Sequence, residues 1–419
     1  MYKINHIKID GFWHRHSVET AFNEEVNVII GRNGTGKTTF MNILQAILAV
    51  DVVALYDNHF DSASIVLVNE QGQKKTIKAT KVEDNRRPFP YVEYKISSRK
   101  YTVMLVGADD GRRPVFLRRQ VNEESSVIRD ALSELLSLAS LSVYRIRNGV
   151  TEPDARDRES AKRYASPVDF RLFELIDRLT RYQLELAQKA QEISIELQKE
   201  VLTSLLYEKE TGGNSIRADY DAAEEKRKLL LAYSQLGITG SYINKRISDH
   251  VGSIDNFVKN LAAKNHGGIL LGAFEAKRRT DKVVTLSLEA AKKREDVYSQ
   301  INLFVELIGS FITDKKFSLV GGELKVEAEG PLPIDKLSSG EKQLLILLIE
   351  AVLQRQEPYI FLADEPELSL HIAWQRKIVP AVKKMNPNAQ IIVATHSPEL
   401  AGRYPQSLID MEDMIHGAA

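Results

Sequence analysis

The feature that most constrains this chain is a phosphate-binding pattern separated from its partner motifs by about 300 residues. Gly31–Thr38 reads GRNGTGKT near the start of the chain. Leu337–Gln343 reads LSSGEKQ and Phe361–Glu367 reads FLADEPE near its end. The first segment can hold a phosphate chain, and the other two can supply carboxylates and a second phosphate contact. The fold must therefore bring distant parts of the chain together.

Composition narrows the class of protein. The 419 residues are enough for more than one core, and a formal net charge of zero gives no global field toward nucleic acid or membrane. The absence of cysteine excludes disulfides and thiolate metal sites. The first residues lack the apolar stretch of a signal peptide, and the longest apolar run, Leu344–Val352, is too short to cross a bilayer. We expect a cytoplasmic protein without a membrane partner.

Residues 1–120 have the pattern of strands around one helix. The helix is predicted at about Lys37–Val50, directly after the apolar strand Val26–Ile30. Further strands are predicted where β-branched residues alternate with polar ones: around Ile4–Ile9, and at Ser64–Asn69, Lys74–Thr80, Tyr91–Ile96 and Tyr101–Val106.

Residues 121–315 have a helical pattern. Apolar residues recur at steps of three and four along two long stretches, about 172–205 and about 284–312. This spacing suits a pair of antiparallel coiled-coil arms. A globular helical bundle has the same periodicity, so both arrangements remain open at this stage. In either case the segment is an insertion between the two ends of the chain.

Residues 316–419 return to strands and helices in alternation. Strands are predicted at Phe317–Val320, Leu324–Glu327, Tyr359–Ala363 and Gln390–Ala394, with helices after Ser339 and after Glu367. Strand–helix alternation of this kind implies a mostly parallel sheet. The simplest fold is an α/β head formed jointly by the two ends of the chain, with a mostly parallel sheet, an antiparallel β subdomain and an inserted helical domain.

The glycine-rich segment has the spacing of a phosphate loop, and a strand precedes it while a helix follows. Its glycines let backbone N–H groups curl around phosphates, and the helix N-terminus adds its dipole. Lys37 is the expected contact to the β- and γ-phosphates. The predicted nucleotide-binding residues of this segment are Gly31, Arg32, Asn33, Gly34, Thr35, Gly36, Lys37, Thr38 and Thr39.

Two carboxylates end the apolar strand Tyr359–Ala363. Beside a phosphate loop, Asp364 is the expected partner of Thr38 in holding Mg²⁺. Glu365 is the expected base that polarises the attacking water. By itself, a buried strand that ends in acidic residues is common, so this assignment depends on the phosphate loop.

Two more segments complete the set. Ser338, Ser339 and Gly340 open a helix, and their hydroxyl and N–H groups can bind a second phosphate. His396 follows the strand Gln390–Ala394 and is the expected sensor of the γ-phosphate. Glu365, His396 and Lys37 are thus the predicted catalytic residues, with ATP and Mg²⁺ as ligands.

These four elements, in this order, resemble the ABC-class ATPase heads of the RecF, SMC/Rad50 and overcoming-lysogenization-defect group. The resemblance covers roughly residues 1–120 and 316–400. It implies ATP hydrolysis at the interface of a homodimer or higher homo-oligomer, where Ser338–Gly340 of one subunit meet the phosphate loop of another. His371 stands where transporter-type relatives have aspartate, and the magnesium-contacting glutamine is not assignable among Gln71, Gln73 and Gln120.

Only 23 residues follow His396, too few for a nuclease fold. The chain is therefore similar to the stand-alone ATPase subunits of bacterial anti-phage systems such as PARIS, Septu and retrons. This resemblance implies a sensor or scaffold that controls a separate effector, a nuclease or toxin. The alternatives are a DNA-repair or DNA-tethering ATPase, a transporter ATPase, and a head that binds ATP with little hydrolysis. The long helical insertion argues against the transporter.

Local charge bears on the DNA alternative. Residues 74–119 contain thirteen Lys or Arg and five Asp or Glu, a local net charge of +8. The arginine pairs Arg86–Arg87, Arg112–Arg113 and Arg118–Arg119 belong to this segment. It can be a face that binds the phosphate backbone of DNA or RNA, or a solvated strand surface. Arg145 and Arg147 are expected to form structural ion pairs.

Overall fold

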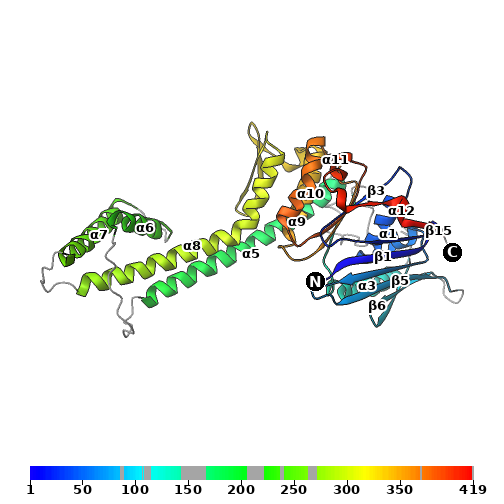
Figure 1. The fold of residues 1–419 in the computed structure, drawn as a ribbon, viewed down its shortest axis with the longest axis horizontal. Helices are drawn as coiled ribbons and strands as arrows, with labels where there is room; N and C mark the ends of the chain where they lie inside the picture. Colours follow the sequence, from blue (N-terminus) through cyan, green and yellow to red (C-terminus); the bar gives the residue numbers. More distant parts are fainter. Residues whose placement is uncertain are drawn as a thin grey trace. The chain divides into compact units, whose positions relative to one another are not determined.

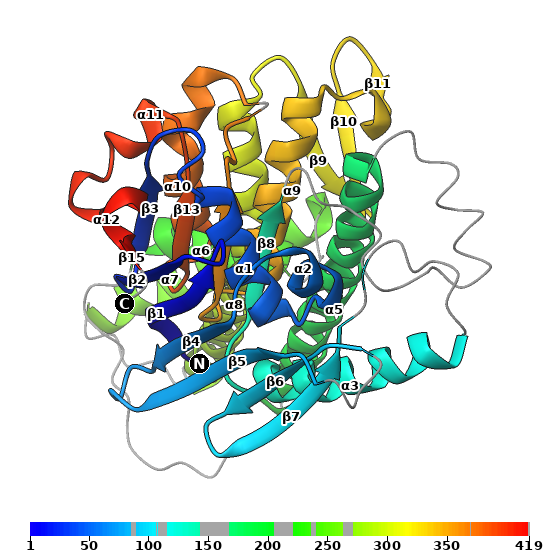
Figure 2. The ribbon, with the colours of Figure 1, turned by 90° about the vertical axis from the view of Figure 1, so that its right-hand side faces the viewer.

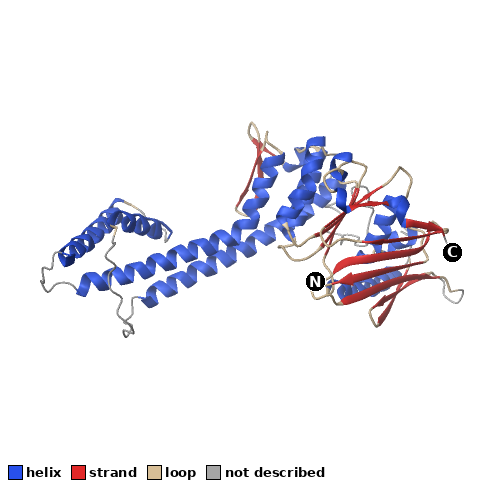
Figure 3. Ribbon diagram, viewed as in Figure 1, coloured by secondary structure: helices blue, strands red, loops and turns tan. Residues whose placement is uncertain are grey.

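The computed structural model describes residues 1–84, 89–105, 107, 115–142, 167–204, 221–235, 240–262, 271–368 and 370–417. The chain divides into two compact units (Figure 1). The first comprises residues 1–180 and 303–419, and the second comprises residues 181–302. The first unit thus contains both ends of the chain. It also contains all the described strands, which Figure 3 draws in red.

A five-stranded, all-parallel sheet forms the centre of the first unit. Its order is β14-β3-β13-β12-β8. The three inner strands are buried on both faces, as expected when helices cover a parallel sheet. The strands are β3 (Val26–Ile30), β8 (Leu138–Ser142), β12 (Ile360–Asp364), β13 (Gln390–Ala394) and β14 (Leu408–Asp410).

A seven-stranded antiparallel sheet forms a second layer, in the order β15-β2-β1-β4-β5-β6-β7. Fully buried side chains alternate with partly or fully exposed ones along β4 and β6, so one face of the sheet contacts the core and the other meets solvent. The strands are β1 (Lys3–Phe12), β2 (His16–Ala21), β4 (Ser62–Val68), β5 (Lys74–Val82), β6 (Tyr91–Ile96), β7 (Arg99–Met104) and β15 (Ile415–Gly417).

Helix α1 (Lys37–Ala49) joins the two layers. Its side chains share one core with the antiparallel strands and with β12 and β13. Figure 2 shows β4, β5, β6 and β7 side by side, with α1 and α2 (Val52–Asp57) on one side of them. The buried hydroxyl of Tyr94 donates to the carbonyl of Ile47 at 3.1 Å and so links β6 to α1. Helix α3 (Val115–Ser133) packs beside β7, where Glu124 accepts the backbone N–H of Met104 at 3.0 Å.

Helix α9 (Ser339–Leu353) is buried over nearly its whole length, and it packs beside α10 (Ile372–Met385). A small sheet, β9 (Lys316–Val320), β10 (Glu323–Glu327) and β11 (Pro331–Leu332), precedes α9. Short elements complete the chain: the 3-10 helices η2 (Ile334–Lys336) and η3 (Pro405–Ser407), and the helices α11 (Pro398–Ala401) and α12 (Met411–Met414).

The second unit contains only helices among its described residues. They belong to α5 (Pro167–Ser204), α6 (Ala222–Gln235), α7 (Ser241–Ala262) and α8 (Leu271–Phe311). Helices α6, α7 and α8 share an apolar cluster of Leu229, Ala232, Ile247, Val251 and Val284. The helical character predicted for this segment is present. The choice between coiled-coil arms and a globular bundle, and the domain boundaries at 120/121 and 315/316, stay predictions.

One strand lies where the sequence pattern indicates a helix. β8 falls within the range predicted to be helical, and it pairs in parallel with β12, with Leu138 opposite Ile360. Its leucines also fit helical spacing, so local pattern alone favours the wrong element. Among the described residues, no helix combines the length and the apolar character needed to cross a membrane.

Candidate nucleotide site

The candidate site lies at the carboxyl ends of three parallel strands. β3, β13 and β12 are neighbours, and their register places Ile29, Ala394 and Asp364 in one row. The phosphate loop follows β3, Glu365 follows β12 and His396 follows β13. Parallel strands end at the same edge of a sheet, which is where ligands bind in open α/β folds. Segments more than 300 residues apart in sequence thus meet at one edge.

The phosphate loop needs glycine at particular positions. Gly31, Gly34 and Gly36 have φ values of 146°, 83° and 100°, a region that other residues seldom adopt. A Cβ on Gly36 would lie 2.9 Å from the ring of Phe12 and 3.0 Å from that of Trp13. Both the backbone conformation and the packing therefore exclude a side chain at Gly36.

The N-terminus of α1 is open to a ligand. Its N-cap residue is Gly36, and no side chain caps the first backbone N–H groups. These groups and the helix dipole favour an anion at this point. The Lys37 ammonium lies in the same loop, where it donates to the carbonyls of Gly31 at 2.8 Å and Arg32 at 3.0 Å.

Electrostatics at Lys37 suit the binding of a phosphate. Burial is the largest influence and lowers the pKa of the Lys37 ammonium, while Glu365, Asp364 and Asp410 act in the opposite direction. The Lys37 side chain is buried. A bound phosphate would place a negative charge beside this ammonium and would so offset the hydration that the ammonium loses on burial.

Asp364 ends β12 beside the phosphate loop. Burial, and to a smaller extent the nearby Glu365 and Glu367 carboxylates, raise the pKa of its carboxyl to about 6. A hydrogen bond from the Thr38 hydroxyl lowers this pKa. Within the described residues, the buried Oδ1 of Asp364 has no hydrogen-bond partner. An oxygen left unsatisfied beside a threonine hydroxyl is a suitable donor for a divalent cation.

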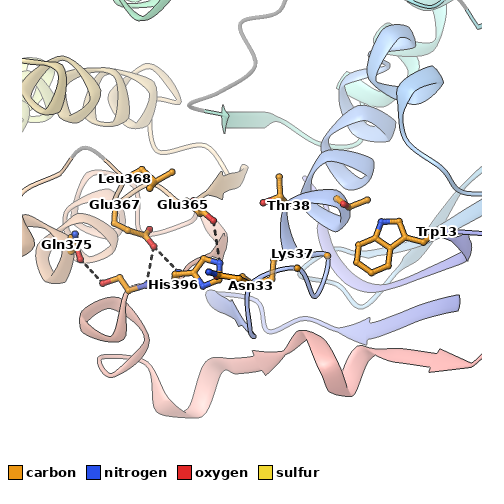
Figure 4. A pocket seen from close by; sticks show the side chains of 13 residues that line it. Trp13, Asn33, Lys37, Thr38, Glu365, Glu367, Leu368, Gln375 and His396 are labelled. Carbon is orange, nitrogen blue, oxygen red and sulfur yellow. Dashed lines mark hydrogen bonds and ion pairs between the residues drawn. The ribbon is translucent and has the colours of Figure 1, made fainter.

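Glu365 has an unusual backbone conformation. Its φ is 48°, a left-handed value that costs free energy for a residue other than glycine, and its N–H donates to the carbonyl of Ala394 at 2.8 Å. The strand thus ends at Asp364, and the turn after it directs Glu365. Glu365 Oε1 lies 3.5 Å from Nε2 of His396. Figure 4 shows this pair near Lys37 and Thr38.

A cavity of about 780 Å³ unites these groups. Of the predicted residues, Asn33, Gly34, Gly36, Lys37, Thr38, Thr39, Glu365 and His396 line it. Five further residues also line it and were missed by sequence reasoning: Trp13, Glu367, Leu368, Gln375 and Ser397 (Figure 4). Trp13 offers an aromatic face next to Gly36. The sequence did offer one signal for Trp13: a tryptophan stands in a turn that precedes the phosphate loop.

The predicted second phosphate site lies elsewhere on the surface. Ser338 is the N-cap of α9 and forms a capping box with Glu341. Ser338 and Ser339 are exposed, Gly340 is buried, and none of the three lines the cavity. Ser338 and Ser339 are therefore accessible to another molecule, and the segment does not belong to the cavity of its own chain.

Several other candidates also lie outside the cavity. Gln71 and Gln73 lie in the turn between β4 and β5, and Gln120 bonds Glu124 on α3. His371 caps α10 by accepting the N–H of Ala373 at 3.3 Å. The remaining candidates lie outside the described residues in whole or in their side chains: Arg86, Arg87, Arg112, Arg113, Arg118, Arg145 and Arg147.

The residues present suit ATP and Mg²⁺. The open helix N-terminus, the positive-φ glycines and Lys37 form a phosphate cradle. Thr38 and Asp364 are placed to hold a cation, which when bound would neutralise charge on the phosphate oxygens. In the described part of the chain, this site included, no group of three or more His, Asp or Glu side chains could hold a metal ion by itself.

A phosphate loop between β3 and α1, paired carboxylates after β12 and a serine-capped α9 define an ATPase head of the ABC class. The chain belongs to the family described as "AAA domain, putative AbiEii toxin, Type IV TA system", whose model matches residues 126–402. The matched region contains the carboxylates, the segment before α9 and His396. The phosphate loop precedes it.

A curated relative is the "Retron Ec83 probable ATPase" of Escherichia coli. It is 36% identical over 80 residues, which is 16% of this chain and 15% of the relative. The chain thus matches about a sixth of that protein's length.

Solved structures with similar folds include Smc head domains. One, from Pyrococcus furiosus, has an extended coiled coil and is bound to the C-terminal domain of ScpA. It covers 100% of this chain and 97% of its own, with 16% identity and a TM-score of 0.47. Another, from Pyrococcus yayanosii, has a coiled coil and joint, with 16% identity, coverage of 100% and 98%, and a TM-score of 0.45. These values are too low to add to what the topology shows.

Proposed function

We propose that this chain hydrolyses ATP with Mg²⁺ at the cavity between the phosphate loop and β12. The observation that carries this proposal is the convergence of Lys37, Glu365 and His396 on one cavity. Glu365 polarises the attacking water, whose oxygen bonds to the γ-phosphorus as the bond to the β-phosphate oxygen breaks. Lys37 binds the phosphates, and His396 contacts the γ-phosphate and the attacking water.

Trp13 extends this proposal to the nucleobase. Its ring packs against Phe12, with ring centroids 4.9 Å apart, and lines the cavity at the phosphate loop. An aromatic face at this point can stack on a base, and such stacking contributes roughly 1–3 kcal/mol. Trp13 is therefore our candidate for the base platform.

The active form is proposed to be a homodimer or higher homo-oligomer. Ser338 and Ser339 are exposed at the N-terminus of α9 and lie outside the cavity of their own chain. A helix N-terminus favours a phosphate through its N–H groups and its dipole, and the Ser338 hydroxyl, which pairs with Glu341 in this structure, would turn to the phosphate. A second copy that presents Ser338–Gly340 to the γ-phosphate would complete each site, so that ATP holds two heads together.

The biological role is proposed to be control of a separate effector, a nuclease or toxin, in anti-phage defence. The family description and the retron relative support this role. The test is expression of this chain with the products of its neighbouring genes during phage infection. Protection that requires both the neighbour and an intact Lys37 supports the role. Protection that persists with Lys37→Ala, or neighbours limited to DNA repair, contradicts it.

A second candidate function, tethering of DNA or RNA, is favoured by one row of lysines. On the solvent face of the antiparallel sheet, Lys78 pairs across strands with Lys95, and Lys95 pairs with Lys100. Lys8 lies in the same row, separated from Lys78 by Ser64, and Glu19 ends it. The row from Lys8 to Lys100 spans about 19 Å at ordinary strand spacing.

Like charges directly opposite each other repel, so this row is costly unless an anion neutralises it. Lys100 contacts Glu93 at 3.1 Å and Lys8 contacts Asp10 at 3.7 Å. Within the described residues, Lys78 and Lys95 are in no ion pair. The uncompensated charge is therefore at the centre of the row, where a phosphate backbone would bind.

The two functions are separable by experiment. Binding of a labelled duplex and a labelled single strand is measured at several salt concentrations. The double variant Lys78→Glu, Lys95→Glu should weaken binding and flatten its salt dependence if the row binds nucleic acid. Lys325→Glu, an exposed lysine on β10, is the matched control. Equal binding by both variants rejects the tethering surface.

A further inference from the structure

A buried carboxylate that the proposed chemistry does not use lies between Glu365 and His396. Glu367 follows Pro366 in the turn after β12, and only 8% of its surface is exposed. Burial of a carboxylate is costly unless it is well hydrogen-bonded. The position of Glu367 therefore calls for an explanation from its partners.

All the hydrogen bonds recorded for the Glu367 carboxylate, within the described residues, go to the loop that carries His396. Its Oε1 accepts from the hydroxyl of Thr395, from the N–H of His396 at 3.0 Å and from the N–H of Ser397 at 3.1 Å. Figure 4 shows the contacts to His396 and Ser397 as dashed lines from Glu367. Charge-assisted bonds of this kind are about twice as strong as neutral ones. One oxygen therefore holds three consecutive residues.

The same turn directs Glu365. The N–H of Leu368 donates to the carbonyl of Glu365 at 3.1 Å, and the N–H of Leu370 donates to that of Glu367 at 2.8 Å. Glu365 and Glu367 thus belong to one hydrogen-bonded turn. The Glu367 side chain in turn hydrogen-bonds this turn to the His396 loop, which follows a different strand.

A second contact supports the same loop from another element. The Ser397 hydroxyl donates to Oε1 of Gln375 on α10 at 2.7 Å, and Gln375 donates to the carbonyl of Leu370 at 3.3 Å. Both side chains line the cavity. The loop is therefore held at its backbone by Glu367 and at its last residue by Gln375.

We propose that Glu367 is a positioning residue that sets His396 against Glu365. Because it fixes the backbone of His396 to the turn that carries Glu365, it maintains the 3.5 Å separation of the two side chains. It acts through the backbone of His396. This inference depends on the proposed ATP hydrolysis, since it assigns a role within that site.

The alternative explanation is purely structural: Glu367 only stabilises the fold. A double-mutant cycle separates the two, because residues that act through one another are not additive. The variants are Glu367→Ala, His396→Ala and the double variant, with kcat and KM for ATP measured for each. Loss of a residue that supports a catalytic side chain from behind commonly lowers activity about 10–100-fold. We expect a loss of this size in kcat for Glu367→Ala.

We expect kcat of the double variant to equal that of the slower single variant. KM for ATP should change little in all three variants. Glu367→Gln keeps an acceptor oxygen and should recover most of the turnover. The proposal is overturned if the loss of kcat in the double variant equals the product of the two single losses. It is also overturned if Glu367→Ala changes only KM. An unchanged kcat for Glu367→Ala overturns it as well.

A matched control comes from the same strand as the His396 loop. Gln390 on β13 is fully buried and bonds the backbone of Ile4 at 2.7 Å and Asn23 at 2.8 Å. Gln390→Ala should lower the melting temperature without changing kcat per folded molecule. If it lowers kcat as much as Glu367→Ala does, a general loss of stability explains both results.

A second measurement keeps failure of this inference distinct from failure of the proposed function. Hydrogen exchange at the amides of His396 and Ser397 does not require turnover. Glu367→Ala should speed that exchange, and Gln390→Ala should not. If the wild-type protein hydrolyses no ATP, the proposed function fails, and exchange alone decides the contact. Unchanged exchange in Glu367→Ala rejects the positioning role.

Discussion

Glu365 Oε1 and His396 Nε2 lie 3.5 Å apart, although the two residues follow different strands and are 31 positions apart in sequence. The pairing arises because β12 and β13 are adjacent and in parallel register. It places a base and a histidine on the same side of the phosphate loop. The predictions below concern this pair and the groups around it.

Glu365→Gln should lower ATP turnover by at least about 100-fold, because an amide cannot polarise and accept a proton from the attacking water. ATP binding should persist, since Lys37 and the phosphate loop are untouched. Nucleotide-bound oligomer should accumulate, as measured by light scattering with ATP. Glu357→Gln, an exposed residue before β12, is the control. Unchanged turnover in Glu365→Gln would show that the head binds ATP without using this residue for hydrolysis.

The Asp364 carboxyl should make the stability of the nucleotide-free protein depend on pH. Its pKa of about 6 in the folded protein is above the value of about 3.9 expected when the chain is unfolded. Its protonated form thus favours folding fully below about pH 4, and this contribution is lost as the pH rises through about 6. Asp364→Asn removes the ionisation.

The measurement is the melting temperature of both proteins without Mg²⁺ between pH 4 and 7. The stability of the Asp364→Asn variant relative to wild type should increase as the pH rises across this range. Comparison of the two proteins cancels the titration of groups they share. A difference that stays constant with pH contradicts the assignment.

Mixing two inactive variants tests the composite site. Lys37→Ala removes a phosphate contact, and Ser339→Arg places a bulky side chain at the exposed start of α9. If each site uses Lys37 of one subunit and Ser339 of another, a mixed dimer has one intact site. An equal mixture should recover about a quarter of wild-type turnover, given random pairing of symmetric subunits. No recovery, with pairing verified by tagged copies, would mean that each site takes both residues from one chain.

Trp13→Ala should weaken ATP binding roughly 5- to 150-fold, the range expected from loss of one base–aromatic stack. The loss should appear in Kd for ATP measured by titration calorimetry. Trp13→Phe keeps an aromatic face and should retain most of the affinity. If binding of inorganic triphosphate falls as much as binding of ATP, Trp13 supports the phosphate loop and does not contact the base.

Local pattern was sufficient for much of the head. The glycine spacing after Val26–Ile30 predicted the phosphate loop, and the structure places the predicted strand and helix on either side of it. The apolar strands before Asp364 and His396 are present as well. β8 was missed because Leu138 and Leu141 fit a helix equally well, and only pairing with β12 makes the segment a strand.

The burial of Glu367 and its partners could not be predicted from the sequence. In the series Asp364, Glu365, Pro366, Glu367 it resembles an acidic residue that faces solvent, and no local signal marks it as buried. Its partners lie 28 to 30 positions away, and they reach it only because two strands are neighbours. Trp13 and Gln375 were missed for the same reason.

The sequence by itself determined the chemistry available to this protein: a phosphate loop, a pair of carboxylates, a serine-capped helix and a histidine, in the order of an ABC-class ATPase. These depend on residue type and short-range spacing, which act through local backbone preference. The tertiary structure alone decided that β8 completes the parallel sheet, that Glu365 faces His396 and that Glu367 fastens the two together. Those relationships depend on which strands are adjacent, and strand adjacency arises from the burial of apolar surface shared by segments far apart in the chain.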